Sequence, residues 1–216
     1  MNKELNDLIN RTREDIIVNK EIEIEIKKED GDLSVFSVLK LPVEDGKGNV
    51  VSFDFLIQDV TEIKKLKYLS FHDSLTGLYN RSFLQEEARR VESGRFSFIG
   101  LIICDIDNLK KVNDSLGHKE GDNLLIAFSR ILEKCFRKSD VVARIGGDEF
   151  AVLLFDATKA SMKRKVDHLR KACQSNNISV SIGLAIGKDI PIIFSNLFSQ
   201  ADEAMYEEKN KKKGHQ

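Results

Sequence analysis

Hydrophobic and polar residues alternate near the start of the chain in a pattern that predicts strands. Ile22, Ile24 and Ile26 alternate with glutamates, which is typical of a half-buried strand. Two further apolar stretches, 33–41 and 50–58, each follow a run of turn-forming residues. The simplest prediction is therefore a three-stranded antiparallel meander, and a meander this small needs a partner surface to be stable.

Helical spacing flanks the meander on both sides. Residues 3–18 carry apolar positions at mostly helical intervals, which predicts a short amphipathic helix. After Asp59 and Thr61, either of which is a candidate N-cap, Ile63, Leu66 and Leu69 recur every three residues and predict a connecting helix. These three side chains form either a seam between two copies of the chain or a face packed on their own domain.

Beyond Phe71 the pattern becomes mixed. In chain order it predicts a helix over 81–92, a strand over 96–104, a helix over 122–136, a hairpin of 141–145 with 149–155, a helix over 159–174, a strand over 179–186 and a helix over 194–212. This order predicts an α+β fold with an antiparallel central sheet flanked by helices, as in ferredoxin-like and palm folds. The predicted division is 1–60, 61–72 and 73–216.

Composition narrows the class of protein. With 216 residues, 41% of them apolar, and two prolines, the chain allows one full folded domain and a smaller appendage. A net charge of −1 argues against a protein that wraps nucleic acid. The longest apolar run, 98–104, is too short to span a bilayer, and the start is too polar for a signal peptide. Three cysteines without a CxxC pair favour a reduced, cytoplasmic protein.

Two acidic pairs carry the candidate chemistry. Asp148 and Glu149 follow a glycine pair that predicts the tight turn of a hairpin, and alone they would be a solvated hairpin tip. Asp105 and Asp107 follow the apolar run, and their spacing of two places them on one side of a strand end. If the two strands are neighbours, these carboxylates converge.

Such convergence needs compensation. Two like charges 4 Å apart repel by about 4 kcal/mol at an effective dielectric constant of about 20. A divalent cation removes this repulsion. Ligands that are all oxygen favour Mg²⁺ or Mn²⁺, and such sites typically serve phosphate chemistry.

Several motifs resemble those of GGDEF-domain diguanylate cyclases. Residues 73–81 (DSLTGLYNR) resemble the family's DxLTGLxNR, 105–122 its DxDxFKxxND…GHxxGD block, 146–150 the signature itself, 181–183 its SIG strand and 201–206 its ADxALY helix. The resemblance covers residues 70–213 and implies the GGDEF version of the α+β fold. The meander with the following DVTEIKKL resembles the C-terminal half of a PAS sensor domain, but it is too short for a whole one. A small dimerising β-appendage is the alternative, so no sensing activity is carried over.

The resemblance implies roles for individual residues. Asp105, the Ile106 carbonyl and Asp148 resemble the magnesium ligands, and Glu149 is the second acid that holds metal or activates the 3′-hydroxyl. The other implied GTP contacts are Asn113 and Asp122 for guanine, and Asn108, Leu109, Lys110, Lys209 and Lys213 for the triphosphate. Leu109 stands where the family commonly has phenylalanine, which matters little if the backbone of this loop makes the contacts. Lys213 stands where the family often has arginine, and its alternative is a solvated basic tail.

The implied reaction is the condensation of two GTP into cyclic di-GMP with release of two pyrophosphates. Each domain binds one GTP, so a homodimer is needed. Arg137 and Asp140 match the RxxD site at which cyclic di-GMP inhibits catalysis in this family, although a surface ion pair has the same spelling. The alternative function is a non-catalytic receptor for GTP or cyclic di-GMP, and a cyclase for adenine nucleotides is disfavoured by Asp122.

Overall fold

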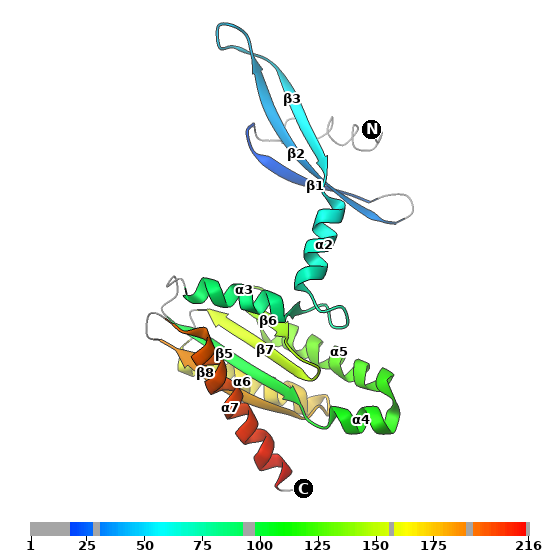
Figure 1. The fold of residues 1–216 in the computed structure, drawn as a ribbon, viewed down its shortest axis with the longest axis vertical. Coiled ribbons are helices and arrows are strands. Elements are labelled where there is room, and N and C mark those ends of the chain that lie inside the picture. The colour runs from blue at the N-terminus through cyan, green and yellow to red at the C-terminus, as the bar shows by residue number, and fades with distance from the viewer. Residues whose placement is uncertain (1–17, 28–30, 93–97, 156–157, 189–191, 215–216) are drawn as a thin grey trace. The chain divides into compact units, whose positions relative to one another are not determined.

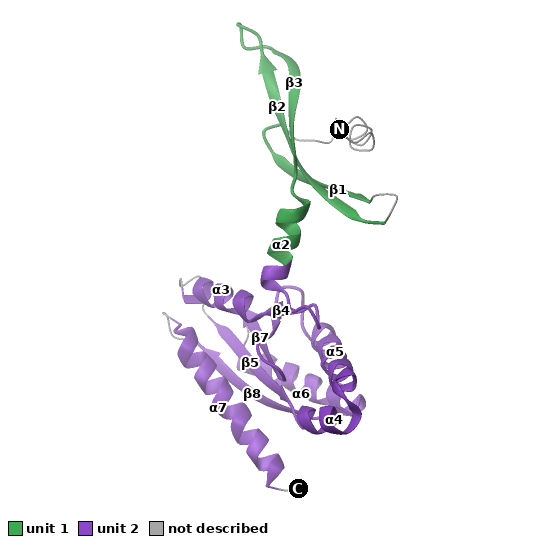
Figure 2. Ribbon diagram, turned by 45° about the vertical axis from the view of Figure 1, so that its right-hand side comes forward, with its two compact units in different colours: residues 1–68 green, residues 69–216 purple. Residues whose placement is uncertain are grey.

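The computed structural model describes residues 18–27, 31–92, 98–155, 158–188 and 192–214 (Figure 1). The chain forms two compact units, Met1–Tyr68 and Leu69–Gln216 (Figure 2). The helix predicted over residues 3–18 lies, except for its last residue, outside the described part. Within that part, no helix combines the length and the apolar character that a membrane crossing requires.

The first unit contains the predicted meander. Strands β1 (Glu21–Lys27), β2 (Leu33–Glu44) and β3 (Val50–Asp59) form an antiparallel sheet in the order β1-β2-β3. The register sets Ile24 opposite Phe36, so the apolar side chains share one face. Around buried Ile26 on this face pack Ile24, Phe36, Phe55 and Ile57. The prediction is confirmed, with β2 three residues longer than its apolar pattern indicated.

Helix α2 (Thr61–Phe71) follows the meander, as predicted. Of the two candidate caps, Asp59 accepts the hydrogen bond from the Thr61 N–H (2.9 Å). The Thr61 hydroxyl has a different task, because its oxygen accepts from the Val35 N–H (2.9 Å) and so joins the helix start to β2.

The second unit is a five-stranded sheet with helices on both faces. The strands, in the spatial order β4-β6-β7-β5-β8, are β4 (Tyr79–Asn80), β6 (Val141–Arg144), β7 (Glu149–Phe155), β5 (Ile99–Ile106) and β8 (Val180–Gly187). The helices are α3 (Arg81–Glu92), α4 (Leu109–Leu116), α5 (His118–Cys135), α6 (Lys159–Ser175) and α7 (Phe194–Lys213). The predicted α+β fold is confirmed, with three differences in detail.

Two elements were not predicted, and one helix begins early. Strand β4 pairs with β6 in parallel, which makes it the exception in an otherwise antiparallel sheet, and its two residues are too few to show a period. Helix α4 has eight residues and only one buried side chain, Leu109. Gly117, at φ +88°, separates α4 from α5, so α5 starts at His118 rather than at residue 122.

Alternate residues of β5 supply two separate cores. Ile99, Leu101 and Ile103 pack with side chains of α3 and α7 on one face. Ile102, Cys104 and Ile106 pack with side chains of α5 and α6 on the other face. Figure 1 shows these helices covering the sheet. Since side chains alternate along a strand, Asp105 extends the set that faces α7.

Helix α7 approaches β8 more closely than a side chain would allow. A Cβ atom on Gly183 would lie 1.9 Å from the Ala201 carbonyl oxygen and 2.4 Å from the Met205 nitrogen. The helix therefore packs on bare strand backbone. Lys209 stands one helical turn beyond Met205, so this contact sets where Lys209 lies.

Candidate active site

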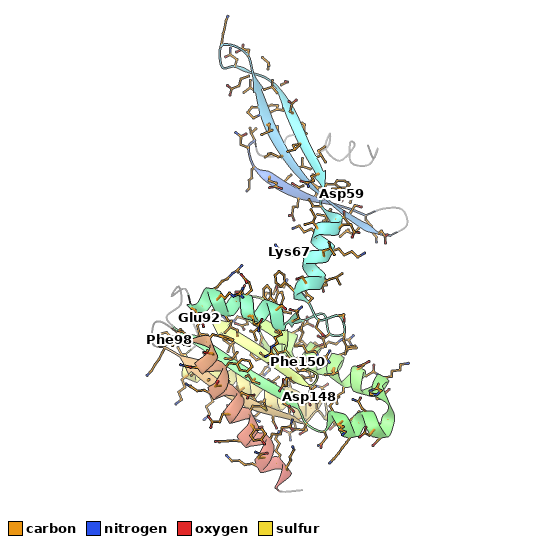
Figure 3. All side chains as sticks on the ribbon, in the orientation of Figure 1. Asp59, Lys67, Glu92, Phe98, Asp148 and Phe150 are labelled. Atoms are coloured by element: carbon orange, nitrogen blue, oxygen red, sulfur yellow. The ribbon has the colours of Figure 1, made fainter. Side chains whose placement is uncertain are left out.

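The predicted acidic residues meet at one end of the sheet. Strand β5 is antiparallel to β7 with Asp105 opposite Glu149, and the Ile106 N–H donates to the Asp148 carbonyl (3.0 Å). Figure 3 shows Asp148 at this end, beside the start of β7 and close to Phe150. The pairing of β5 with β7 thus brings Asp105 next to Glu149, although these two residues lie 44 positions apart in the sequence.

Asp105 is only 3% exposed, and only one of its two carboxylate oxygens has a hydrogen-bond partner among the described residues. Its Oδ2 accepts from the Lys209 Nζ at 2.6 Å, whereas its Oδ1 is buried and has no hydrogen-bond partner among the described residues. Burial and the negative charges of Asp148 and Asp107 raise the pKa of this carboxyl above its ordinary value, against the opposing effect of Lys209. Asp105 is therefore only partly compensated: Lys209 pairs with one of its oxygens and nothing described pairs with the other.

Glu149 has the same electrostatic character. Burial raises the pKa of its carboxyl, and repulsion from Asp148, Asp105 and Asp202 adds to the increase. Its side chain lies over the signature turn, where a Cβ atom on Gly146 would come within 2.6 Å of the Glu149 Oε2. A glycine at 146 thus makes room for this carboxylate.

The donor set suits a hard divalent cation, although Lys209 is the positive charge beside Asp105 in this arrangement. The described residues contain no group of three or more His, Cys, Asp and Glu side chains that could hold a metal ion. The chemistry of the donors nevertheless fits, because the acids and the Ile106 carbonyl supply oxygen alone and the buried Asp105 Oδ1 is unpartnered.

Asp107 differs sharply from Asp105, although the spacing of two predicted that both would converge. Its carboxylate accepts from the Ser179 hydroxyl (2.6 Å), the Ser181 hydroxyl (2.7 Å) and the Lys212 Nζ (2.9 Å). Burial alone would raise the pKa of Asp107, but these hydrogen bonds outweigh it and lower the pKa. Asp107 therefore joins β5 to β8 and α7 rather than adding to the acids that are only partly compensated.

A cavity of about 460 Å³ lies beside these acids and is rich in lysine. Its volume is in the range of small-molecule sites. Asn108, in a left-handed conformation with φ +63°, precedes α4 at its edge, with Leu109 buried and Lys110 exposed behind it. The lining residues are Asp107, Asn108, Ser179, Glu208, Lys209, Lys211, Lys212 and Lys213.

Sequence reasoning found Asp107, Asn108, Lys209 and Lys213 of this lining but missed Lys212, Ser179 and the nearby Ser181. Lys212 lies three residues after Lys209, a spacing that places two side chains on one helix face. Ser179 and Ser181 share the spacing of two that Asp105 and Asp107 show. These spacings are visible in the sequence, but that they lead to contacts follows only from the pairing of β5 with β8, in which Asp105 lies opposite Ser181.

The predicted guanine contacts lie on the two helices that follow β5. Asn113 is on α4, and its Oδ1 is buried without a hydrogen-bond partner among the described residues. Asp122 is on α5 and is exposed. One amide and one carboxylate are thus available for hydrogen bonds at this pair of helices.

The predicted inhibitory site is a turn after α5. The Arg137 N–H donates to the Asp140 Oδ2 (3.0 Å), while the Arg137 side chain is exposed. Lys165 of α6 donates to the same oxygen at 2.6 Å and lies 5.1 Å from the centre of the Phe136 ring. Lys165 was missed because it is 25 residues away from Asp140 in sequence.

Comparison with known proteins agrees with this geometry. The family described as "Diguanylate cyclase, GGDEF domain" matches residues 70–215. The chain is 33% identical over 195 residues to a protein of Escherichia coli (strain K12) named "Probable diguanylate cyclase DgcE", an alignment that covers 83% of this chain and 18% of DgcE. Other curated relatives are covered over 41% of their length or less, so the chain spans less than half of them.

Solved structures share the fold of the second unit. Diguanylate cyclase SiaD from Pseudomonas aeruginosa, in complex with its activator SiaC, has a TM-score of 0.63 at 29% identity, over 69% of this chain and 62% of that chain. The GGDEF domain of DgcB from Caulobacter crescentus, in complex with c-di-GMP, has a TM-score of 0.60 at 28% identity, over 66% of this chain and 89% of that chain.

Proposed function

Since the chain belongs to the GGDEF-domain family of diguanylate cyclases, we propose that it condenses two GTP into cyclic di-GMP and releases two pyrophosphates. The observation that carries this proposal is the gathering of Asp105, Asp148 and Glu149 at one end of the sheet, beside a lysine-lined cavity. Members of the family that do not catalyse usually lose these acids. The free thiols of Cys104, Cys135 and Cys173 support a reduced, cytoplasmic location.

Asp105, the Ile106 carbonyl and Asp148 are the proposed ligands of Mg²⁺ or Mn²⁺, with Glu149 as the further acid. When bound, the cation would offset the charge that develops on the phosphates during transfer. The support for this assignment is the electrostatics of the acids: burial and mutual repulsion raise the pKa values of Asp105 and Glu149. Lys209, which pairs with Asp105 in this structure, would then exchange that partner for the triphosphate.

The proposed GTP contacts form two groups, one for guanine and one for the triphosphate. Asn113 and Asp122 would pair with guanine, because a carboxylate accepts from the N1 and N2 hydrogens that adenine lacks. Backbone amides at Asn108 and Leu109 would bind the phosphates together with three lysines, Lys110, Lys209 and Lys213. Their support is the place of Asn108, Lys209 and Lys213 in the cavity lining.

Ring closure requires a second copy of the chain, since each domain would hold one GTP. Ile63, Leu66 and Leu69 of α2 are 57%, 64% and 56% exposed, and this apolar stripe is the proposed dimer seam. The RxxD turn is the proposed site of feedback inhibition, with Arg137 and Asp140 as contacts to cyclic di-GMP. The related DgcB domain was crystallised in complex with c-di-GMP, which supports a product site in this family.

Turnover at several protein concentrations tests the proposal. Purified protein with Mg²⁺ and GTP should release pyrophosphate and form cyclic di-GMP at a rate that rises with about the square of protein concentration when dilute. A first-order dependence at concentrations where size-exclusion chromatography shows only monomer would contradict assembly of the site from two copies. Bound but unreacted GTP would instead identify a non-catalytic receptor.

A further inference from the structure

The Arg144 side chain joins the signature turn to a distant loop. Arg144 ends β6, and its Nη1 donates to both carboxylate oxygens of Asp73, at 3.1 and 3.3 Å. Its Nη2 and Nε donate to the Gly147 carbonyl at 2.8 and 3.3 Å. One planar guanidinium thus contacts two partners at once, as its fork of donors allows.

The Asp73 end of this link is rigidly held. The Asp73 Oδ1 also accepts from the Thr76 N–H (2.9 Å) and hydroxyl (2.7 Å), and the Asp73 N–H donates to the Leu78 carbonyl (2.8 Å). Hydrogen bonds from Thr76 and Arg144 lower the pKa of Asp73, although burial acts in the opposite direction. The side chains of Arg144 and Asp73 are 14% and 22% exposed, so solvent screens this ion pair less than a surface pair.

The Gly147 end has no comparable packing. Gly147 is exposed, and a Cβ atom added to it would meet nothing within 4 Å. Hydrogen bonds therefore hold this peptide, and Arg144 supplies two of them. Because a peptide unit is planar, holding the Gly147 carbonyl also fixes the orientation of the Asp148 N–H that follows it.

We propose that Arg144 is a positioning residue for Asp148 and Glu149, and that Asp73 orients Arg144, so that the loop directly after α2 sets the geometry of the signature turn. This inference rests on the proposed function. It adds that the two acids depend on a residue that contacts neither GTP nor metal. Misplacing a reacting group by about 1 Å can cost about 100-fold in rate, so such a link has a measurable effect.

Kinetics of an Arg144 series provide the first test. Arg144→Gln should lower kcat about 10-fold or more and leave KM for GTP within about 2-fold, since the contacts to guanine and phosphate lie on other elements. Arg144→Lys should not restore kcat, because an ammonium group lacks the fork. Arg89→Gln, which removes an exposed ion pair with Glu86 on α3, is the matched control and should leave kcat unchanged. A wild-type kcat in Arg144→Gln would overturn the inference.

A double variant tests whether the link acts as one unit. Asp73→Asn should lower kcat by a smaller factor, about 3-fold to 10-fold, because Arg144 loses its orienting charge but keeps its bonds to Gly147. Asp73→Asn combined with Arg144→Gln should be no worse than Arg144→Gln alone. Losses that multiply would show that the two residues act separately and would contradict the proposal.

Hydrogen exchange measured by mass spectrometry separates this inference from the proposed function. In Arg144→Gln, amides of the turn 145–149 should exchange at least about 5-fold faster, while those of β5 remain unchanged. If the wild-type protein does not turn over GTP, the proposed function fails, and the exchange result still decides the positioning role. If Arg144→Gln does not fold, the same comparison is made with Asp73→Asn. Unchanged exchange in the turn would refute the link.

Discussion

The acidic end of the sheet and the turn around Asp140 differ in how completely their carboxylates are paired with cations and hydrogen-bond donors. At the first, Lys209 pairs with one oxygen of Asp105, the other oxygen is buried without a partner among the described residues, and the pKa values of Asp105 and Glu149 are raised. At the second, Asp140 receives the Arg137 N–H and the Lys165 ammonium. Carboxylates that the fold leaves only partly balanced are candidates for binding a cation, whereas fully paired carboxylates hold structure or must exchange a partner.

The largest expected effect is at the acidic end. Asp148→Ala and Glu149→Ala should each lower turnover of GTP by at least about 100-fold, because each removes a charge that would act on the reacting phosphate. Circular dichroism should show an intact fold, and Glu133→Ala, at an exposed acid of α5, is the control. Near-normal product from either variant would remove these acids from the site.

The next effect concerns the turn around Asp140. Arg137→Ala should raise the cyclic di-GMP concentration for half-inhibition about 10-fold or more, since a hydrogen bond to a charged group contributes about 1.5–3 kcal/mol. Rates without added product should remain at the wild-type level. Arg130→Ala, at an exposed arginine within α5, is the control. Inhibition that does not change would make Arg137 and Asp140 a surface feature.

Charge removal at the same turn should destabilise the fold. Asp140→Asn keeps the side-chain shape but leaves Lys165, which is 22% exposed, without its ion-pair partner. We expect a loss of about 1 kcal/mol, which corresponds to about 3 °C in Tm. Lys165→Gln should cause a similar loss, and the two changes together should be less than additive in thermal melts. An unchanged Tm would show that this pair contributes nothing to stability.

Charge removal at the acidic end should have the opposite sign and the smallest size. The pKa of Glu149 is higher in the folded state than its ordinary value of 4.5. Ionising this carboxyl therefore lowers the stability of the fold as the pH rises from about 4.5 through the raised pKa. Glu149→Gln should therefore melt like wild type at low pH and about 1 °C higher at pH 8 in metal-free buffer, because solvent screens this half-exposed carboxylate. A lower Tm at pH 8 would show that Glu149 is not under repulsion.

The sequence predicts an element of this fold well only where the element is long enough to show a hydrophobic period. Strand β5 and helix α7 were predicted to within a few residues, because a long apolar pattern is visible in the sequence without knowledge of the tertiary contacts. Strand β4 has two residues and α4 has one buried side chain, so neither has a period to detect.

The candidate site divides in the same way. Motifs located Asp105, Asp148 and Lys209, which the strand pairing and α7 bring together. The ammonium, guanidinium and serine hydroxyl partners of Asp107, Asp140 and Asp73 come from segments that lie 25 to 105 residues away. Tertiary packing decides which ammonium or hydroxyl group contacts which carboxylate, and the local sequence pattern does not predict these pairs.

The bare backbone of Gly183 has an effect that reaches beyond β8. The strand and α7 meet there without an intervening side chain, so even a methyl group at position 183 would push the helix away from the strand. The ammonium groups of Lys209 and Lys213, one and two turns further along α7, would move with it. If Lys209 and Lys213 bind the triphosphate as proposed, a side chain at position 183 would weaken nucleotide binding while every acid of the signature remains in place.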